Sequence, residues 1–378
     1  MPWKESSLMS TRLEFILLAR RAGSNIAALC CAFGISRKTA YKWLERYRLD
    51  GEGGLQDQSR RPHASPATSQ SELEAQVLKL NAQYPCWGSR KLRNLLPASC
   101  TQPHHSTIDA ILRRHGREVL GAPDRRPDAP SRFEHPAPNL LWQMDFKGHF
   151  PLTDRRAGHC HPLTILDDHS RFNLCLAACG NEQRSTVQEA MTATFERYGL
   201  PERITADNGP PWGMTGAEGL TQLEVWLIRL GIRISHSRAY HPQTQGKDER
   251  FHRTLKLEVL EREGFNSLAA CQVAFDNWRD RYNLVRPHEA LGQQPPVSRY
   301  QASGRHFPKE LPAVEYESDD IVRSVSHKGD ISYGSARHFV GQGLKAQRVA
   351  LRPTGIDGVL DVYFCHHQIR QIDARTAL

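Results

Sequence analysis

The chain has 378 residues and a net charge of +9, which is enough length for two to four domains of ordinary size and too much for a peptide-like binder. Its nine cysteines form no Cys-X-X-Cys pair, no apolar run approaches the roughly 20 residues of a membrane span, and no signal-peptide pattern is found. We therefore expect a cytoplasmic protein with reduced thiols and no membrane attachment. The first third carries most of the excess positive charge, which points to a polyanionic partner.

Residues 24 to 48 have the pattern of a helix-turn-helix. Apolar residues recur at helical spacing up to Phe33, Gly34 interrupts them, and Ser36 can cap a second helix. Basic residues recur on one face of that helix, where a recognition helix meets a DNA groove. We interpret residues 1–60 as a DNA-binding domain; the alternative is a solvated basic face on a small helical domain. The candidate DNA contacts are Arg37, Lys38, Lys42 and Arg46.

A segment rich in Gly, Ser, Arg and Pro leads to a second helical cluster over residues 68–120. We expect this cluster to be another helix-turn-helix domain, with Arg90 and Lys91 as candidate DNA contacts. Two such units in tandem would cover more than one turn of duplex. Residues 121–138 contain a proline every few positions, which predicts a linker.

Residues 139–300 begin with strands and continue with strands that alternate with helices. This order is typical of one α/β mixed sheet with helices on its faces. The predicted strands are 141–150, 163–168, 171–179, 204–206 and 232–235, and the predicted helices are 183–198, 220–231 and 245–262. Residues 313–378 are short alternating runs joined by Gly and Asp turns, which predict a small all-β barrel.

Three acidic residues stand where this fold could bring them together. Asp145 lies in the first strand, Asp207 ends the fourth, and Glu249 lies in the first turns of the long polar helix. Repulsion near 4 Å would cost about 4 kcal/mol per pair at an effective dielectric of 20, so a converged cluster would need a cation. Carboxylates suit Mg²⁺ or Mn²⁺. Taken singly, each has an ordinary explanation as a turn former or a helix-dipole partner.

Several longer motifs carry a resemblance to a known family. The stretches WQMDFKGHF, ITADNG and HPQTQGKDERFHRTLK look like the first-Asp strand, second-Asp strand and Glu helix of the DDE transposases and retroviral-type integrases. DDHSRF resembles the family's hairpin turn, and YNLVRPHEALGQQPP resembles the close of its catalytic domain. The chain is most similar to the bacterial insertion-sequence transposases of the IS481 type. Their layout of tandem helix-turn-helix units, catalytic domain and small β-barrel is also similar.

The resemblance implies a central RNase H-like fold in which Asp145, Asp207 and Glu249 are the catalytic residues and bind two Mg²⁺ or Mn²⁺ ions. Such a pair of ions can activate the attacking oxygen and stabilise the leaving one during phosphoryl transfer. The resemblance also implies that Lys256 contacts DNA near the active site. Arg253 is a phosphate-contact candidate by spacing, with a solvated charge or a pair with Glu249 as the alternative.

The spacing between Asp207 and Glu249 is longer than in the family pattern, and residues 210–219 can hold the extra residues as a loop. Two other acidic residues are rival ligands. Asp168 fits the hairpin turn, and Asp248 is offset by about 100° around the helix from Glu249.

The activity implied is that of a DNA transposase. It would bind the terminal inverted repeats of its element, cleave the ends by metal-dependent hydrolysis and join the 3′-OH to target DNA by transesterification. Synapsis of two ends implies a homodimer or higher oligomer on DNA. The alternative is a transposase-derived helix-turn-helix regulator whose acidic cluster is inactive. The sequence has no Gly-rich phosphate-binding loop, so it does not indicate ATP binding. Its histidine pairs have no Cys or His at the spacing that a zinc site needs.

Overall fold

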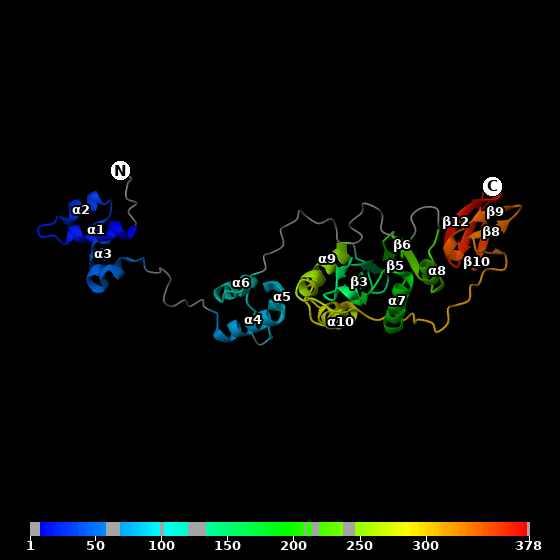
Figure 1. Ribbon diagram of the computed structural model, residues 1–378, viewed down its shortest axis with the longest axis horizontal. Helices are drawn as coiled ribbons and strands as arrows, with labels where there is room; N and C mark the ends of the chain where they lie inside the picture. Colours follow the sequence, from blue (N-terminus) through cyan, green and yellow to red (C-terminus); the bar gives the residue numbers. More distant parts are fainter. Residues whose placement is uncertain are drawn as a thin grey trace. The chain divides into compact units, whose positions relative to one another are not determined.

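The computed structural model describes residues 8–57, 69–98, 102–119, 134–207, 209–213, 219–236 and 246–375. The chain divides into two compact units, Met1–Thr68 and Ser69–Leu378, whose elements are drawn in Figure 1. Within the described ranges no helix is long and apolar enough to cross a membrane.

The first unit is a three-helix domain of α1 (Leu8–Ala19), α2 (Ile26–Ala32) and α3 (Arg37–Asp50), followed by the 3₁₀ turn η1 (Gly51–Leu55). The predicted turn and cap are confirmed: Gly34 has a φ of +62°, and the Ser36 side chain accepts from the Thr39 N–H at 3.1 Å. Helix α1 was not predicted, because its apolar residues are consecutive instead of periodic. It supplies Phe15 and Ile16 to the core.

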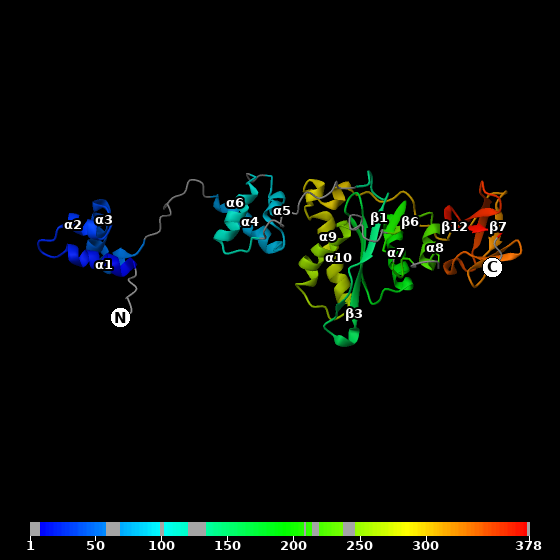
Figure 2. The same cartoon turned by 90° about the horizontal axis from the view of Figure 1, so that it is seen from above.

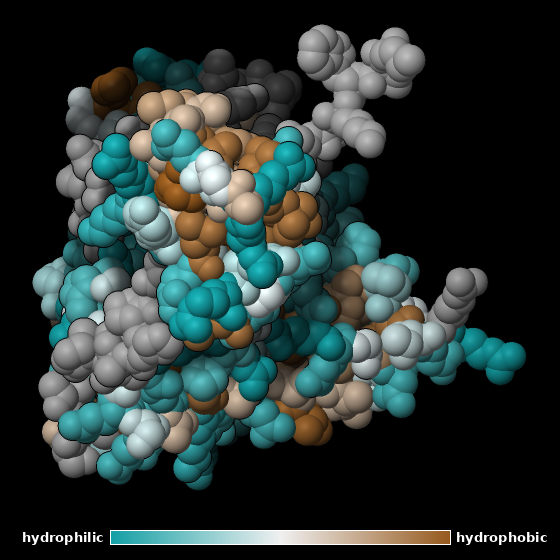
Figure 3. Space-filling model, turned by 90° about the vertical axis from the view of Figure 1, so that its left-hand side faces the viewer, coloured by the Kyte–Doolittle hydropathy of each residue, from teal (hydrophilic) through white to brown (hydrophobic). Residues whose placement is uncertain are grey.

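The surface of the protein keeps several large apolar side chains exposed. Two of them, Leu17 and Leu49, belong to the first unit and are 53% and 64% exposed. Figure 3 shows apolar atoms gathered between hydrophilic groups on the face that it draws.

The second unit begins with α4 (Ser71–Gln83), α5 (Ser89–Asn94) and α6 (His105–Arg114). These helices enclose their own apolar core, as the spacing of apolar residues predicts. Its most buried members are Val77, Trp87, Leu92, Ile108 and Ile111.

A mixed sheet forms the centre of the second unit, as predicted. The strands are β1 (Trp142–Phe146), β2 (Phe150–Pro151), β3 (His159–Asp167), β4 (Asn173–Cys179), β5 (Arg203–Ala206) and β6 (Arg233–His236). Their order is β2-β3-β1-β5-β6, and β4 pairs with β3. Strand β1 is antiparallel to β3 and parallel to β5. The predicted single strand 141–150 is wrong: it breaks into β1 and β2, and Gly148 between them has a φ of +84°.

Helices cover both faces of this sheet (Figure 2). Helices α7 (Arg184–Tyr198) and α8 (Gln222–Arg229) pack with one apolar core, and α9 (Gly246–Leu255) and α10 (Leu268–Leu284) pack with another. The strand alternation divides the side chains accordingly: Leu163 and Ile165 of β3 belong to the first core, and Leu166 to the second. The predicted helix 245–262 is α9 continued by the π-helical turn η4 (Lys256–Leu260). Helix α10 was not predicted.

The C-terminal part is all-β, as predicted, and its strands form two antiparallel sheets around one core. The larger sheet has the order β12-β11-β10-β7, and the smaller is β8-β9. The core also receives Val225 and Ile228 from α8, so this part packs directly on the central domain. The strands are β7 (Ile321–Ser324), β8 (Asp330–Tyr333), β9 (Ala336–Phe339), β10 (Arg348–Pro353), β11 (Val359–Phe364) and β12 (His367–Asp373).

Candidate active site

Asp145 and Asp207 lie beside each other at the ends of two neighbouring parallel strands. The register of β1 and β5 pairs Trp142 with Ile204 and Gln143 with Thr205. Continued by two residues, the same register sets Asp207 opposite Asp145. Neighbouring strands lie about 4.8 Å apart, and residues paired in register point to the same face. The sheet itself therefore brings these two carboxylates together.

The environment of Asp145 shows the cost of this arrangement. Burial raises the pKa of the Asp145 carboxyl to about 6, and the negative charge of Asp207 acts in the same direction. A proton or a cation between the two carboxylates would relieve this repulsion.

A threonine and a histidine hold the back of Asp145. The Thr164 hydroxyl donates to the Asp145 carbonyl at 2.9 Å and lies 2.9 Å from His252 Nε2. Because the hydroxyl proton is already used, the imidazole donates from Nε2. Burial lowers the pKa of His252 to about 4, so this side chain is neutral. Neither residue was predicted from the sequence. A signal for His252 was present, because it lies three positions after Glu249 on the helix predicted to bear a metal ligand.

The Asp207 backbone is held from β6. His236 Nδ1 lies 3.0 Å from the Asp207 carbonyl oxygen, and His236 Nε2 lies 2.9 Å from Glu224 Oε1. The hydrogen bond to Glu224 raises the pKa of His236. Glu224 is itself placed by a capping box with Thr221 at the start of α8. The end of β5 is thus tied to a neighbouring strand and to a helix.

The start of α9 presents two adjacent carboxylates in different ways. Glu249 is exposed, whereas Asp248 is 2% exposed, and its Oδ1 atom has no hydrogen-bond partner among the described residues. Burial, followed by the charges of Asp145 and Asp168, raises the pKa of Asp248 well above its ordinary value. In this structure, therefore, the inward-facing carboxylate of α9 is Asp248.

Asp168, the other rival ligand, is occupied by structural contacts in the β3–β4 turn. It accepts from the His135 N–H at 2.9 Å, from Gln143 Nε2 at 3.0 Å, and from Lys247 Nζ. Burial acts to raise its pKa, but the hydrogen bonds from Lys247 and His135 hold the pKa of Asp168 below its ordinary value. Lys247 thereby fastens the beginning of α9 to the hairpin.

The structure thus brings Asp145 and Asp207 together and leaves Glu249 on the exposed side of α9. Among the described residues, no three His, Cys, Asp or Glu side chains converge as a metal-binding group. Residues 237–245, which precede α9, lie outside the described residues.

The candidate DNA contacts of the first unit lie on α3. Arg37, Lys38 and Lys42 are exposed, as expected of a recognition helix. Arg46 is half-buried, and its guanidinium lies 5.0 Å from the centre of the Trp43 ring. Its place is explained by packing over Trp43.

Two of the candidate contacts of the second unit form ion pairs within the protein. Arg90 pairs with Glu289 at 3.5 Å, and Lys256 pairs with Glu261 at 3.4 Å. Both pairs are exposed, so exchange for a phosphate would cost little. Arg253 is exposed and Lys91 is half-buried; burial, followed by repulsion from Arg286, lowers the pKa of Lys91 to about 8.

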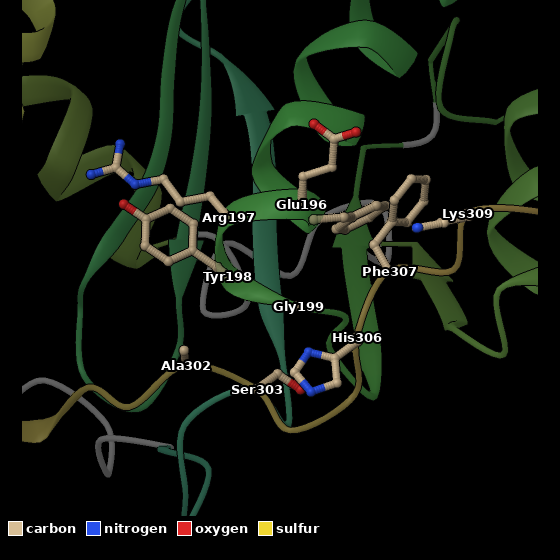
Figure 4. Close-up of a pocket in the computed structure, with 10 residues that line it drawn as sticks. Glu196, Arg197, Tyr198, Gly199, Ala302, Ser303, His306, Phe307 and Lys309 are labelled. Atoms are coloured by element: carbon tan, nitrogen blue, oxygen red, sulfur yellow. The ribbon is translucent and has the colours of Figure 1, made fainter.

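A pocket of about 530 Å³ opens where the end of α7 meets residues 302–309. Figure 4 shows Tyr198, His306 and Phe307 among the side chains around it. Neither the paired aspartates nor Glu249 line this pocket. It therefore adds nothing to the carboxylate site.

Comparison with known protein families accounts for most of the chain. Residues 11–63 match a helix-turn-helix domain, and residues 39–112 match a homeodomain-like domain. Residues 135–242 and 230–296 match two integrase core domain families. Residues 320–377 match the C-terminal domain of the IS481 family transposases.

The chain is also similar to individual proteins. A 31.7 kDa protein of insertion element IS407 from Burkholderia multivorans is 25% identical over 64% of this chain and 85% of its own length. The transposase of transposon Tn552 from Staphylococcus aureus is 23% identical over 89% of this chain and 75% of its own length. The magnesium-bound, trimeric HTLV-2 integrase catalytic core is 16% identical, with a TM-score of 0.34 over 44% of this chain and 99% of that chain.

The matched domains follow one another in the order that the sequence motifs predict. Helix-turn-helix domains precede an integrase core, which belongs to the polynucleotidyl transferase superfamily, and the C-terminal part matches the C-terminal domain of the IS481 family transposases. The chain is thus similar to the IS481 family of transposases over residues 320–377, and to integrase core and helix-turn-helix families over the parts that precede them.

Proposed function

We propose that this protein cleaves the DNA ends of its own insertion sequence by metal-dependent hydrolysis and joins each freed 3′-OH to target DNA by transesterification. Asp145, Asp207 and Glu249 are the proposed catalytic residues. Assembly of two ends in one complex requires at least two copies of the chain on DNA.

The observation that carries this proposal is the register of the adjacent parallel strands β1 and β5, which pairs Gln143 with Thr205 and, continued by two residues, sets Asp207 opposite Asp145. Two carboxylates at this separation repel each other, and the raised pKa of Asp145 records that repulsion together with its burial. A structural role would be better served by an amide or a hydroxyl, because neither carries a charge to be offset.

The donor set fits Mg²⁺ or Mn²⁺. Carboxylate oxygens are the ligands that these hard cations prefer, and the charge of Asp207 acting on the Asp145 carboxyl shows that two negative charges lie close together here. Asp145, Asp207 and Glu249 would hold the ions. Two ions bound there would supply an activated attacking oxygen and charge stabilisation of the leaving one.

The other residues of the site orient the catalytic carboxylates or bind DNA. Thr164 and neutral His252 hold the strand that bears Asp145, and His236 holds the Asp207 carbonyl. The exposed basic residues Arg37, Lys38 and Lys42 of α3 contact the terminal repeat, and Arg253 and Lys256 contact the strand near the carboxylates. These contacts neutralise phosphates, so binding weakens with rising salt.

The test uses a labelled duplex that carries the element end, incubated with Mg²⁺, Mn²⁺ or EDTA. Wild type should give nicked and strand-transferred products only with metal. Asp207→Asn should lose them by more than about 100-fold, since even outer-shell partners of metal ligands are worth 10- to 100-fold. The matched control is Asp319→Asn, which changes an exposed aspartate in the C-terminal part and should retain activity.

The two adjacent carboxylates of α9 provide a second comparison. Glu249→Gln should abolish the products, whereas Asp248→Asn should retain them, because the asparagine has the same size and needs no counter-charge in a buried place. The opposite result would assign the third ligand to Asp248. Sequence-specific binding without metal-dependent products from wild type would instead establish the DNA-binding regulator.

A further inference from the structure

Glu258 is a buried carboxylate that the proposed chemistry does not use. It lies in η4, the π-helical turn that continues α9, and its side chain is 8% exposed. Single π turns inside helices are uncommon and often occur at functional positions. Glu249, a proposed catalytic residue, lies nine positions earlier on the same continuous helix.

Three hydrogen-bond donors converge on the two oxygens of Glu258. Within the integrase core, Trp278 Nε1 donates to Oε2 at 2.9 Å, and Arg286 Nε donates to Oε1 at 2.9 Å. The third donor comes from the preceding helical domain: Trp87 Nε1 donates to Oε1 at 3.1 Å. The Trp87 ring, 2% exposed, belongs to the apolar core of α4, α5 and α6.

Two further hydrogen bonds join the helical domain to the same part of the core. The Cys86 thiol donates to the Leu257 carbonyl at 3.4 Å, and Arg262 Nε donates to the Cys86 sulfur at 3.0 Å. These contacts, however, are exposed. A buried indole N–H and a buried carboxylate each cost much more when left unpaired, so the Trp87–Glu258 contact dominates this set.

The positive charges at the contact between the helical domain and the core add to the importance of the Glu258 carboxylate. Burial is the main cause that lowers the pKa of Lys91 of the helical domain; Arg286 and Arg250 of the core lower it further, while Glu258 and Glu289 act in the opposite direction. Without the Glu258 charge, only Glu289 would oppose the repulsion among Lys91, Arg286 and Arg250.

We propose that Glu258 is a positioning residue that docks residues 69–119 on the helix bearing Glu249. We call the hydrogen bonds of Glu258 with Trp87, Trp278 and Arg286 the clasp. The clasp fixes the distance between DNA bound by the helical domain and the proposed catalytic carboxylates. The docking itself is independent of the chemistry; its effect on catalysis rests on the proposed function.

Docking can be measured by a disulfide between the native Cys86 and a cysteine introduced by Leu257→Cys. Leu257 is 50% exposed, and its carbonyl already touches the Cys86 sulfur. In otherwise wild-type protein the cross-link should form rapidly under mild oxidant and be found by mass spectrometry of the linked peptides. Adding Cys86→Ser should abolish it.

The clasp is then weakened in the same background. Glu258→Gln replaces one acceptor oxygen with a donor and removes the charge, and should slow the cross-link roughly tenfold. Trp87→Phe removes the indole donor together with part of the buried ring system, keeps one aromatic ring in the helical core and should also slow the cross-link. Glu261→Gln, three residues away in an exposed pair, should change the rate by less than about twofold. Equal rates for wild type, Glu258→Gln and Trp87→Phe would overturn the proposal, as would failure of Cys86 and Leu257→Cys to cross-link.

The rate of product formation distinguishes a positioning role of Glu258 from a purely structural one. With saturating end DNA, Glu258→Gln should lower the rate of product formation roughly tenfold and leave the Kd for the DNA end within about twofold. Oxidising the Cys86 cross-link in the Glu258→Gln background should restore the rate; no recovery would overturn the positioning role. If wild type forms no metal-dependent product, the proposed function fails, while the cross-linking rates still decide the docking.

Discussion

Asp168 and Asp248 lie close to the same end of α9, yet their carboxyl groups have opposite environments. Asp168 receives hydrogen bonds from Lys247, Gln143 and the His135 backbone, and its pKa is lowered. Asp248 has one oxygen without a partner among the described residues, and its pKa is raised. Neither difference is visible in the sequence, because the donors to Asp168 come from three separate segments.

Glu74 offers a pH-dependent test at the residue scale. It joins the first turn of α4 to the end of α6 by binding Arg114 and His115 Nε2, the latter at 3.0 Å. The His115 hydrogen bond holds the pKa of Glu74 below its ordinary value. Its stabilising contribution is therefore complete above the unfolded pKa of about 4.3 and is lost as the pH falls through the lower folded-state pKa.

We expect Glu74→Gln to destabilise the helical domain by about 0.5–1 kcal/mol at pH 7 and to destabilise it less as the pH falls below about 4.3. The measurement is hydrogen exchange of the α6 amides in both proteins across this pH range. Glu72→Gln, in the same turn but exposed, controls for the loss of charge. A difference of the same size at pH 3 and at pH 7 would contradict the ion pair.

Helix α10 covers the open edge of the central sheet at the element scale. Strand β4 pairs only with β3 among the described strands, so its outer backbone groups need other partners. Asn283 accepts from the Asn173 N–H at 2.8 Å and donates to the Asn173 carbonyl at 2.9 Å. Gln272 does the same for the Ala178 N–H and the Leu176 carbonyl. Two amide side chains thereby take the place of a further strand.

Asn283→Leu should destabilise the protein by roughly 2–4 kcal/mol, because it leaves a buried N–H and a buried carbonyl unsatisfied. Urea unfolding at a fixed protein concentration measures the loss. The control is Val273→Ser on the exposed side of the same helix, where Val273 is 64% exposed; its effect should stay within about 0.5 kcal/mol. Equal effects of the two changes would show that Asn283 does not cap the strand.

The sequence contains a periodic signal for α10. Its apolar residues recur at spacings of three and four, as on a helix face packed against a sheet; they are Leu268, Cys271, Phe275, Trp278 and Tyr282. The capping role of its two amides, by contrast, depends on which strand ends at the sheet edge. That order is set by long-range pairing.

At the scale of the whole molecule, the C-terminal sheets and the integrase core share side chains. Val225 and Ile228 of α8 are buried with Val349, Leu351 and other residues of the C-terminal core. The two parts approach so closely that a Cβ added at Gly343 would meet the Leu220 carbonyl oxygen, a backbone atom that cannot move aside easily. Shared burial of this kind opposes free movement of the C-terminal part.

Gly343→Ala should therefore cost about 1–3 kcal/mol, the usual penalty for overpacking, and should loosen the contact with α8. Thermal unfolding and the rate of proteolysis between residues 300 and 320 measure the two effects. Gly355→Ala is the matched control, since a Cβ there meets nothing within 4 Å and should leave both measurements unchanged. If proteolysis is no faster in Gly343→Ala than in wild type, the close contact at Gly343 is not needed to hold the C-terminal part on the core.

The sequence by itself determined the order of the parts, the helix-turn-helix of the first unit and the kinds of elements in the central sheet. These follow from local chemistry: Gly34 permits a positive φ, Ser36 caps a helix, and apolar residues alternate or recur with the period of their element. It also singled out Asp145, Asp207 and Glu249, whose catalytic role stays a prediction.

Only the tertiary structure decided which side chains meet. The parallel register of β1 and β5 sets Asp207 beside Asp145, and the rotation of α9 turns Asp248 inward and Glu249 outward. Residues far apart in sequence, Trp87 and Glu258, pair across two domains. Strand register, helix rotation and domain contact depend on the packing of the whole chain, because each is selected by apolar burial and hydrogen bonding between distant segments.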